Sequence, residues 1–392
     1  MYRTTGKSHS KIIMWSAPLS AYSGKMRAYL TKAGIDFEER YPVDPRYPAE
    51  IMPQIGYYVV PVLEMPDGTL MQDTSDAFLH LEKLPGVTSL IPPTPVQRAL
   101  SSLINFFGTD AFLKPGMHYR WSVIDQQRHW LETSFLDFVP GTMNREESRS
   151  LADKIMTFYN AYCPELGISA ETIPAIEESW LDCMDIMDRH FAVHPYLLGG
   201  RPSIGDCGLM TFFYPHLARD PVPATLMKNR APHLYRWTER MNRTLLGDGG
   251  FTHVAPEFHP DDEVPETLLP FLEYLFADAG PEVVATIKAF NNMLDTHPEL
   301  AAGDSLTLPG GPQTAHPPAG YIEYQLRGTP IRRQALVDTV YQHQQVLKEI
   351  DALGNASKSR LTALIERTGG EAWLNARPDR PIKYEHYTYR LA

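Results

Sequence analysis

Cysteine is scarce in this chain. Its 392 residues include only Cys163, Cys183 and Cys207, an odd number, widely spaced and without a Cys-x-x-Cys pair. This pattern argues against a disulfide framework and against a thiolate metal site. Cys183 and Cys207 stand in apolar helical contexts, so we expect them to be small core residues rather than reactive thiols. A reducing, cytoplasmic compartment fits this usage.

Long apolar runs and basic clusters are also lacking. No apolar run approaches the roughly 20 residues that span a bilayer, so we expect no membrane segment. Residues 1–10 carry positive charge but no apolar stretch, so we expect no secretory signal. The net charge is −11. Because phosphate binding needs clustered Lys and Arg, the sequence argues against nucleic acid as a main partner.

The length allows two or three domains, and the composition is that of a globular protein. Four prolines, at positions 85, 92, 93 and 95, indicate a stiff linker that ends a first domain. Beyond it, apolar residues recur at helical spacing. We expect helices over 96–112, 148–162, 173–192 and 232–246.

The last 140 or so residues also show folded patterns. Each expected helix there has an apolar face to bury, so the segment is predicted to be folded rather than a disordered tail. A Pro/Gly-rich stretch at 308–320 divides it. We expect helices within 264–277 and 283–294, a hairpin over 321–331, a long helix over 333–352, and one more helix around 361–365.

The first 85 residues alternate strand and helix signals. An apolar strand at 11–15 leads through a serine-rich loop into a helix that Gly34 ends, and a second strand follows at 37–41. Val60-Pro61 then precedes a hairpin with the turn Pro66-Asp67-Gly68, and a polar run from Gln72 opens another helix. This order predicts an α/β layer.

Val60-Pro61 and the polar run together could dock a small peptide. A proline at a tight turn is a candidate for a cis bond, which would turn the Val60 backbone outward to pair with a peptide strand. Asp73 and Thr74, at a helix start, could hold a carboxylate and an amine. The alternative is an ordinary edge hairpin followed by ordinary helix caps.

This arrangement resembles the thioredoxin-like domain of the glutathione S-transferase superfamily, and the run Tyr196–Leu209 resembles the core-helix entry of its all-helical domain. Ser203 and Asp206 in that run have capping-box spacing, a structural role. The resemblance implies an α/β thioredoxin-like domain at 10–86 and an all-α domain at 96–247. It leaves residues 258–392 as a mainly helical extension of no recognised family.

The resemblance also implies glutathione as co-substrate, a small apolar electrophile as its reaction partner, and a homodimer. Glutathione contacts carried over from the family are the Val60 backbone with Pro61 cis, and a set of polar residues. That set consists of Gln72, Asp73 and Thr74, with Gln54 as a further candidate. Aromatic residues of 116–135 would line the electrophile pocket, and Tyr119 and Trp121 are the candidates there.

Such an enzyme must ionise a thiol that ordinarily titrates near about pH 8.5. A hydroxyl donor and a helix N-terminus both favour the thiolate. The spacing Ser20-Ala-Tyr-Ser23 matches a thioredoxin Cys-x-x-Cys with oxygen in place of sulfur, which removes dithiol chemistry. Ser20 is the first candidate, although Ala21 stands where many relatives have Pro. Ser23, Tyr22 and Ser16 are alternatives, and the serines could instead be plain helix caps.

The sequence therefore predicts a glutathione S-transferase-like enzyme that directs the glutathione thiolate at an apolar electrophile. Conjugation, ether cleavage and dehalogenation begin with the same attack and are not distinguished. The alternative is a non-catalytic protein that binds glutathione or an apolar ligand, or that serves in assembly, on the same fold.

Overall fold

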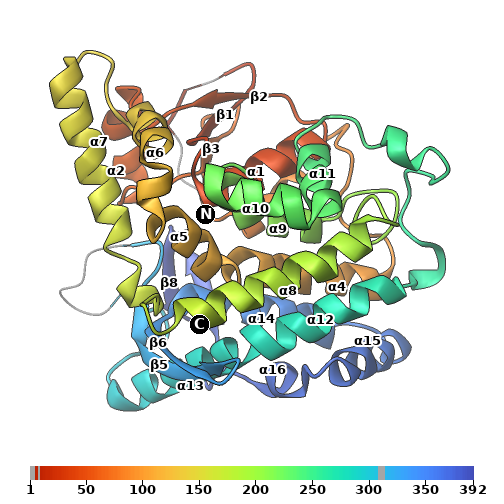
Figure 1. Ribbon diagram of the computed structural model, residues 1–392. Coiled ribbons are helices and arrows are strands. Elements are labelled where there is room, and N and C mark those ends of the chain that lie inside the picture. The colour runs from red at the N-terminus through yellow and green to blue at the C-terminus, as the bar shows by residue number, and fades with distance from the viewer. Residues whose placement is uncertain (1–4, 8, 308–313) are drawn as a thin grey trace.

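The computed structural model describes residues 5–7, 9–307 and 314–392. The N-terminal unit is a four-stranded sheet of order β2-β1-β3-β4, in which β1 runs parallel to β2 and antiparallel to β3 (Figure 1). This is the predicted thioredoxin-like layer. Its elements are β1 (Ile12–Trp15), α1 (Ala21–Lys32), β2 (Phe37–Arg40), a helical turn (Tyr47–Ile51), α2 (Met52–Ile55), β3 (Val62–Glu64), β4 (Leu70–Met71) and α3 (Thr74–Leu81).

The two faces of this sheet are covered differently. Ile12 and Met14 of β1 join the main core with α1 and α3. Ile13 and Trp15, which alternate with them, pack under the segment Tyr47–Ile55. The sequence left that segment undefined, because it has a proline at position 48 and its short apolar runs fit neither the helical nor the strand period.

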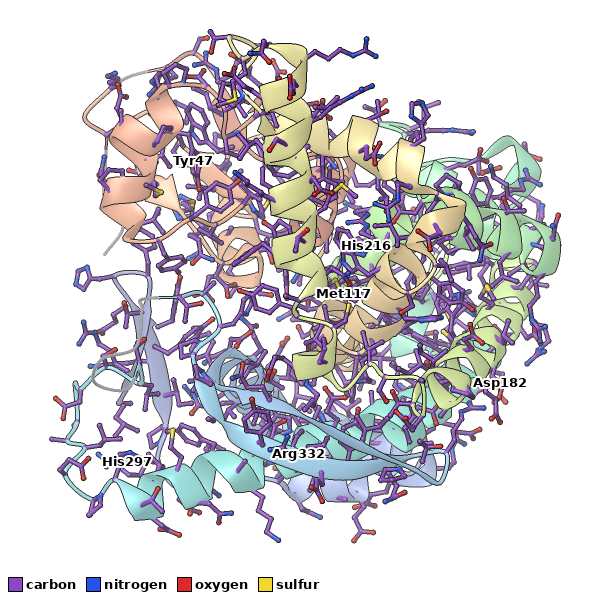
Figure 2. All side chains as sticks on the ribbon, turned by 60° about the vertical axis from the view of Figure 1, so that its left-hand side comes forward. Tyr47, Met117, Asp182, His216, His297 and Arg332 are labelled. Atoms are coloured by element: carbon purple, nitrogen blue, oxygen red, sulfur yellow. The ribbon has the colours of Figure 1, made fainter. Side chains whose placement is uncertain are left out.

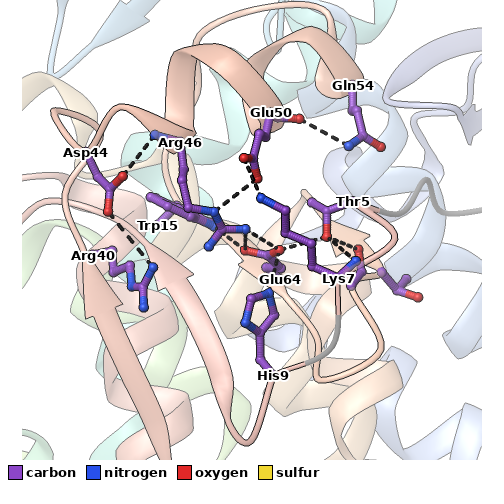
Figure 3. A network of polar contacts seen from close by, with 12 residues as sticks. Thr5, Lys7, His9, Trp15, Arg40, Asp44, Arg46, Glu50, Gln54 and Glu64 are labelled. Carbon is purple, nitrogen blue, oxygen red and sulfur yellow. Dashed lines mark hydrogen bonds and ion pairs between the residues drawn. The ribbon is translucent and has the colours of Figure 1, made fainter.

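A polar network holds β3 on this second face (Figure 3). Glu64 has no exposed side chain and accepts hydrogen bonds from Trp15 Nε1 at 3.1 Å and from Arg46 at 2.9 Å. Thr5 donates to the same carboxylate at 2.8 Å. Because a buried charge needs such partners, β3 and the segment that leads to it are fixed relative to β1.

The second unit is all-helical, as predicted. Its centre is the crossing of α4 on α9, where backbones approach so closely that a Cβ on Gly108 would stand 2.5 Å from the Gly208 carbonyl carbon. Only glycine fits this crossing. The helices are α4 (Pro95–Asp110), α5 (Leu113–Trp121), α6 (Arg128–Phe135), α7 (Arg145–Asn160), α8 (Ile173–Phe191), α9 (Ile204–Phe212), α10 (Pro221–Arg230) and α11 (Pro232–Met241).

The predicted capping box is present at the start of α9. The Asp206 carboxylate accepts from the Ser203 backbone N–H at 2.8 Å and from Trp237 Nε1 at 3.1 Å, and all three residues are buried. The role is structural, since each of its oxygens is occupied by the protein itself. Cys183 and Cys207 have no exposed surface, which confirms them as core residues.

The extension is mainly helical and contains a hairpin, as predicted, and it also contains a second hairpin that the sequence did not predict. Its elements are α12 (Leu269–Tyr274), α13 (Gly280–Thr296), β5 (Pro318–Leu326), β6 (Thr329–Leu336), α14 (Val337–Asp351), α15 (Asn355–Arg367), α16 (Glu371–Asn375), β7 (Ile382–Glu385) and β8 (Thr388–Leu391). The predicted helix start at 333 is wrong, because β6 continues to Leu336. The hairpin predicted at 321–331 is present, and in the structure it extends further at both ends, from Pro318 to Leu336. Part of the Pro/Gly-rich stretch lies outside the described residues.

The extension packs into the rest of the molecule and shares its core. Trp373, 1% exposed, lies against Phe106 and Phe107 of α4, with ring centroids 5.9 and 5.6 Å away. Asp262 accepts from the first two free N–H groups of α4, Val96 at 2.9 Å and Gln97 at 2.8 Å. Among the helices that the structure describes, none is both long and apolar enough to cross a membrane.

Candidate functional site

The serine-rich loop after β1 ends at the N-terminus of α1. Ser20 is the N-cap: its φ of −76° and ψ of 128° are extended, and its Oγ accepts from the Ser23 N–H at 3.4 Å. Ser20 is half-exposed, whereas Ser23 has no exposed surface and its Oγ accepts from the Ala17 N–H. Of the two serines, only Ser20 can therefore reach a ligand.

Two ion pairs, one half-buried and one buried, fix the loop from either side. Arg27 of α1 pairs with Glu39 of β2, and its guanidinium also donates to the Ala17 carbonyl at 3.4 Å. Ser16 donates to the same carboxylate at 2.5 Å, so its hydroxyl is already used. The partial positive charge of the α1 N-terminus is thus held in one place beside the Ser20 hydroxyl.

On the other side, Arg120 of α5 donates to the Leu19 carbonyl at 3.0 Å and pairs with Asp220 at 2.7 Å. Burial and the Arg120 guanidinium hold the pKa of His216 well below its ordinary value, so the neutral ring can accept from Arg120. Figure 2 shows His216 and Met117 in the helical unit, between Tyr47 of the sheet unit and Arg332 of the β5–β6 hairpin. The loop is therefore braced by the helical unit.

Tyr22 is the remaining hydroxyl of the loop. Burial, with the carboxylate of Asp110, raises the pKa of Tyr22 well above its ordinary value, so the phenol stays protonated at neutral pH. Its ring lies 5.8 Å from the ring of His316 and 6.4 Å from that of Phe212. Tyr22 therefore remains a possible hydrogen-bond donor at this end of α1.

The Val60–Pro61 bond is cis, as the sequence predicts. Trp15, the last residue of β1, stands opposite Val62, the first residue of β3. Val60 and Pro61 therefore lie beside the point where β1 passes into the serine-rich loop. Within the described residues, neither the N–H nor the C=O of Val60 makes a hydrogen bond. Half-exposed backbone groups without a partner are available to a peptide ligand.

Asp73 and Thr74 stand at the start of α3, as predicted. Asp73 is the N-cap with a φ of 78°, and its Oδ1 accepts from the N–H groups of Ser75 at 2.9 Å and Asp76 at 3.1 Å. Thr74 is the first residue of the helix and is 8% exposed. Gln72 stands just before the cap, and its Oε1 lies 3.2 Å from the Tyr57 hydroxyl oxygen.

The base of α3 joins α1 through a buried lysine. Lys25 donates to Ser75 at 3.0 Å and to Thr109 at 2.9 Å. Burial lowers the pKa of Lys25 to about 8, although Asp73 opposes the shift. Burial and the Asp73 carboxylate raise the pKa of Asp76 to about 7. Burial and the neighbouring carboxylate thus both disfavour a charge on Asp76.

The remaining candidates lie elsewhere. Tyr119 and Trp121 on α5 are 6% and 3% exposed, and the Trp121 ring packs at 5.7 Å from Phe135. A role for them in an electrophile pocket stays a prediction. Gln54 lies in α2 and donates to the Glu50 carbonyl at 3.1 Å (Figure 3).

Several residues at this site come from the extension, and the sequence did not predict them. Gln342 of α14 donates to Asp73 Oδ2 at 2.9 Å, and the Tyr384 hydroxyl of β7 donates to Gln72 Oε1. His316, paired with Asp338 at 2.8 Å, lies over Tyr22. The one signal in the sequence was the density of tyrosines at 384–389, which no periodicity assigned to this site.

Family models match both N-terminal units. Residues 15–89 match the glutathione S-transferase N-terminal domain, and residues 170–240 match the glutathione S-transferase C-terminal domain. None of the curated proteins matches the chain significantly.

Solved structures with partial likeness include two glutathione transferases and a beta-etherase. A glutathione transferase from Phanerochaete chrysosporium is 15% identical, covers 62% of this chain and 100% of its own, and has a TM-score of 0.42. The beta-etherase LigF from Sphingobium sp. is 16% identical, with coverages of 59% and 95% and a TM-score of 0.41. A Tau class glutathione S-transferase from mango, Mangifera indica, is 15% identical, with coverages of 66% and 94% and a TM-score of 0.38.

Proposed function

Because the chain belongs to the glutathione S-transferase superfamily through these two domains, we propose that it binds glutathione and activates its thiol for attack on an apolar electrophile. The observation that carries the proposal is the half-buried Ser20 at the N-terminus of α1, at the end of the loop that leaves β1 next to Val60 and cis Pro61. A hydroxyl donor and a helix N-terminus together favour a thiolate.

Each candidate residue then has one role. The backbone N–H and C=O of Val60, next to cis Pro61, pair with the glutathione peptide. Asp73 accepts from its amine, and Gln72 with the first turn of α3 at Thr74 meets its carboxylate. The Ser20 hydroxyl donates to the sulfur, and Tyr22 is the alternative donor. The thiol proton leaves to solvent, the sulfur bonds to the electrophilic carbon, and the leaving group departs.

We further propose that the protein works in the cytoplasm. Glutathione is abundant there, and the three buried cysteines of the protein stay reduced. A homodimer, the habit of the family, stays a prediction. The extension covers the face of α4 that carries Phe106 and Phe107, so a second copy would dock on a different surface.

The test is a rate assay with glutathione and three classes of electrophile, namely an activated aryl chloride, an aryl ether and an alkyl halide. We expect a rate above the uncatalysed one with at least one class, saturable in glutathione. The class that reacts identifies conjugation, ether cleavage or dehalogenation.

A second candidate function is a binding or assembly protein without turnover. The contacts of Gln342 and Tyr384 with Asp73 and Gln72 favour it, because they bring the extension onto the glutathione side. Glutathione binding without any rate in the three assays would support this candidate and contradict the enzyme.

A further inference from the structure

Three separate parts of the extension meet three residues proposed for glutathione. Gln342 of α14 bonds Asp73, Tyr384 of β7 bonds Gln72, and His316 lies over Tyr22. Other contacts hold the extension against the rest of the molecule. They are the packing of Trp373 on α4 and the buried pairing of Glu282 with Lys114 and Arg333.

The contact with Gln72 fixes its amide. The Tyr384 hydroxyl donates to Oε1, and the Tyr57 hydroxyl lies 3.2 Å from the same oxygen. With Oε1 held between two hydroxyls, Nε2 must turn the other way. Within the described residues it makes no hydrogen bond. A fixed amide nitrogen with two free N–H groups is a donor for a carboxylate.

The contact with Asp73 fixes its carboxylate. Oδ1 accepts from the N–H groups of Ser75 and Asp76 in the first turn of α3, and Oδ2 accepts from Gln342 Nε2 at 2.9 Å. A carboxylate offers about four lone-pair sites, so an ammonium group can still bind. The φ of 78° at Asp73 is rare outside glycine and persists only where the surroundings hold it. Gln342 contributes to that hold.

We propose that Gln342 and Tyr384 are positioning residues of the glutathione site, holding Asp73 toward the amine and Gln72 toward the carboxylate of the γ-glutamyl end. This inference rests on the proposed function. It makes the extension part of the glutathione site of its own chain. The γ-glutamyl end would then be recognised by side chains far apart in sequence, since Gln342 and Asp73 are separated by 269 residues.

The test is calorimetric titration of the full-length protein with glutathione. Since a hydrogen bond to a charged group is stronger than a neutral one, Gln342→Ala should weaken binding about tenfold and Tyr384→Phe about fivefold. In the Asp73→Asn background, Gln342→Ala should have no further effect. A glutathione analogue without the α-amino group should bind wild type and Gln342→Ala equally, which a merely structural loss would not produce.

Two matched controls carry changes of the same kind elsewhere in the extension. Tyr321→Phe removes a hydroxyl that donates to Glu165 at 2.5 Å, and Asn291→Ala removes an amide that holds Arg377 and Asp379. Both should bind glutathione like wild type. Unchanged affinity in Gln342→Ala and Tyr384→Phe overturns the inference. Tighter binding also does so, because the side chains would then compete with the ligand. Absence of binding to wild type defeats the proposed function itself.

Discussion

Replacing Ser20 by Ala should lower the rate of glutathione attack about a hundredfold and leave glutathione affinity nearly unchanged. In the proposed mechanism the hydroxyl stabilises the thiolate, so its loss should return the pKa of the bound thiol toward the ordinary value of about 8.5. The protonated thiol does not attack, and the rise of kcat/KM with pH should therefore shift to higher pH. Steady-state kinetics across pH, with the electrophile that the assays identify, measure both effects.

Ser20 also caps α1, so the variant needs controls that keep the cap. Ser20→Thr retains both the hydroxyl and the cap and should retain most of the rate. Tyr22→Phe removes the rival hydroxyl without touching the cap. If Tyr22→Phe loses the rate while Ser20→Ala loses only about 1 kcal/mol of stability, Ser20 is a cap and Tyr22 is the thiolate donor.

Replacing Glu282 by Gln should lower the free energy of unfolding by about 3–5 kcal/mol. Glu282 of α13 is bonded by Lys114 of α5 and Arg333 of β6, and Tyr324 donates to it at 2.5 Å. All these side chains are at most 7% exposed. The substitution removes the carboxylate that both buried cations bond directly. Chemical denaturation of both proteins measures the difference.

The same residue gives a pH dependence. Burial alone would raise the pKa of Glu282, but Arg333 and Lys114 outweigh it and lower that pKa to about 2, against 4.5 for a free side chain. A lowered pKa means that the stabilisation is complete above 4.5 and is lost as the pH falls toward 2. The stability difference between wild type and Glu282→Gln should shrink across that range.

The control for Glu282 is an exposed pair on the same hairpin. Glu323 and Arg332 face each other at 4.0 Å with side chains 78% and 63% exposed. Glu323→Gln should change stability by less than about 1 kcal/mol, since exposed ion pairs contribute little. An equally small effect of Glu282→Gln would contradict a central role for the buried cluster in docking the extension.

Features encoded within a few residues were predictable. The cis bond at Pro61, the start of α3 at Asp73 and the capping box at Ser203 each depend on neighbours in sequence. The helix start at 333 was wrong for a reason that the structure supplies. Ile331, Arg333 and Ala335 alternate inward along β6, but the middle one is charged and is buried only because Glu282 pairs with it. The two-residue alternation of a strand is therefore not recognisable here from the sequence alone.

The part of the site that comes from the extension could not be predicted. Tyr384 lies 312 residues from Gln72, and no local pattern pairs them. Hairpin β7–β8 is short. Its buried residues are Ile382, Tyr389 and Leu391, and they form a recognisable pattern only once the two strands are paired. The division of the chain at 10–86, 96–247 and 258–392 stays a prediction, since one hydrophobic core runs through all three parts.

Glutathione binding itself is the central claim, and calorimetric titration of wild type beside Asp73→Asn tests it most directly. Asn keeps the cap oxygen and tolerates the positive φ, so the variant removes the charge and leaves the start of α3 intact. The account predicts saturable one-to-one binding to wild type and binding about tenfold weaker to Asp73→Asn. No binding to wild type at millimolar glutathione, or equal binding to both proteins, would contradict it.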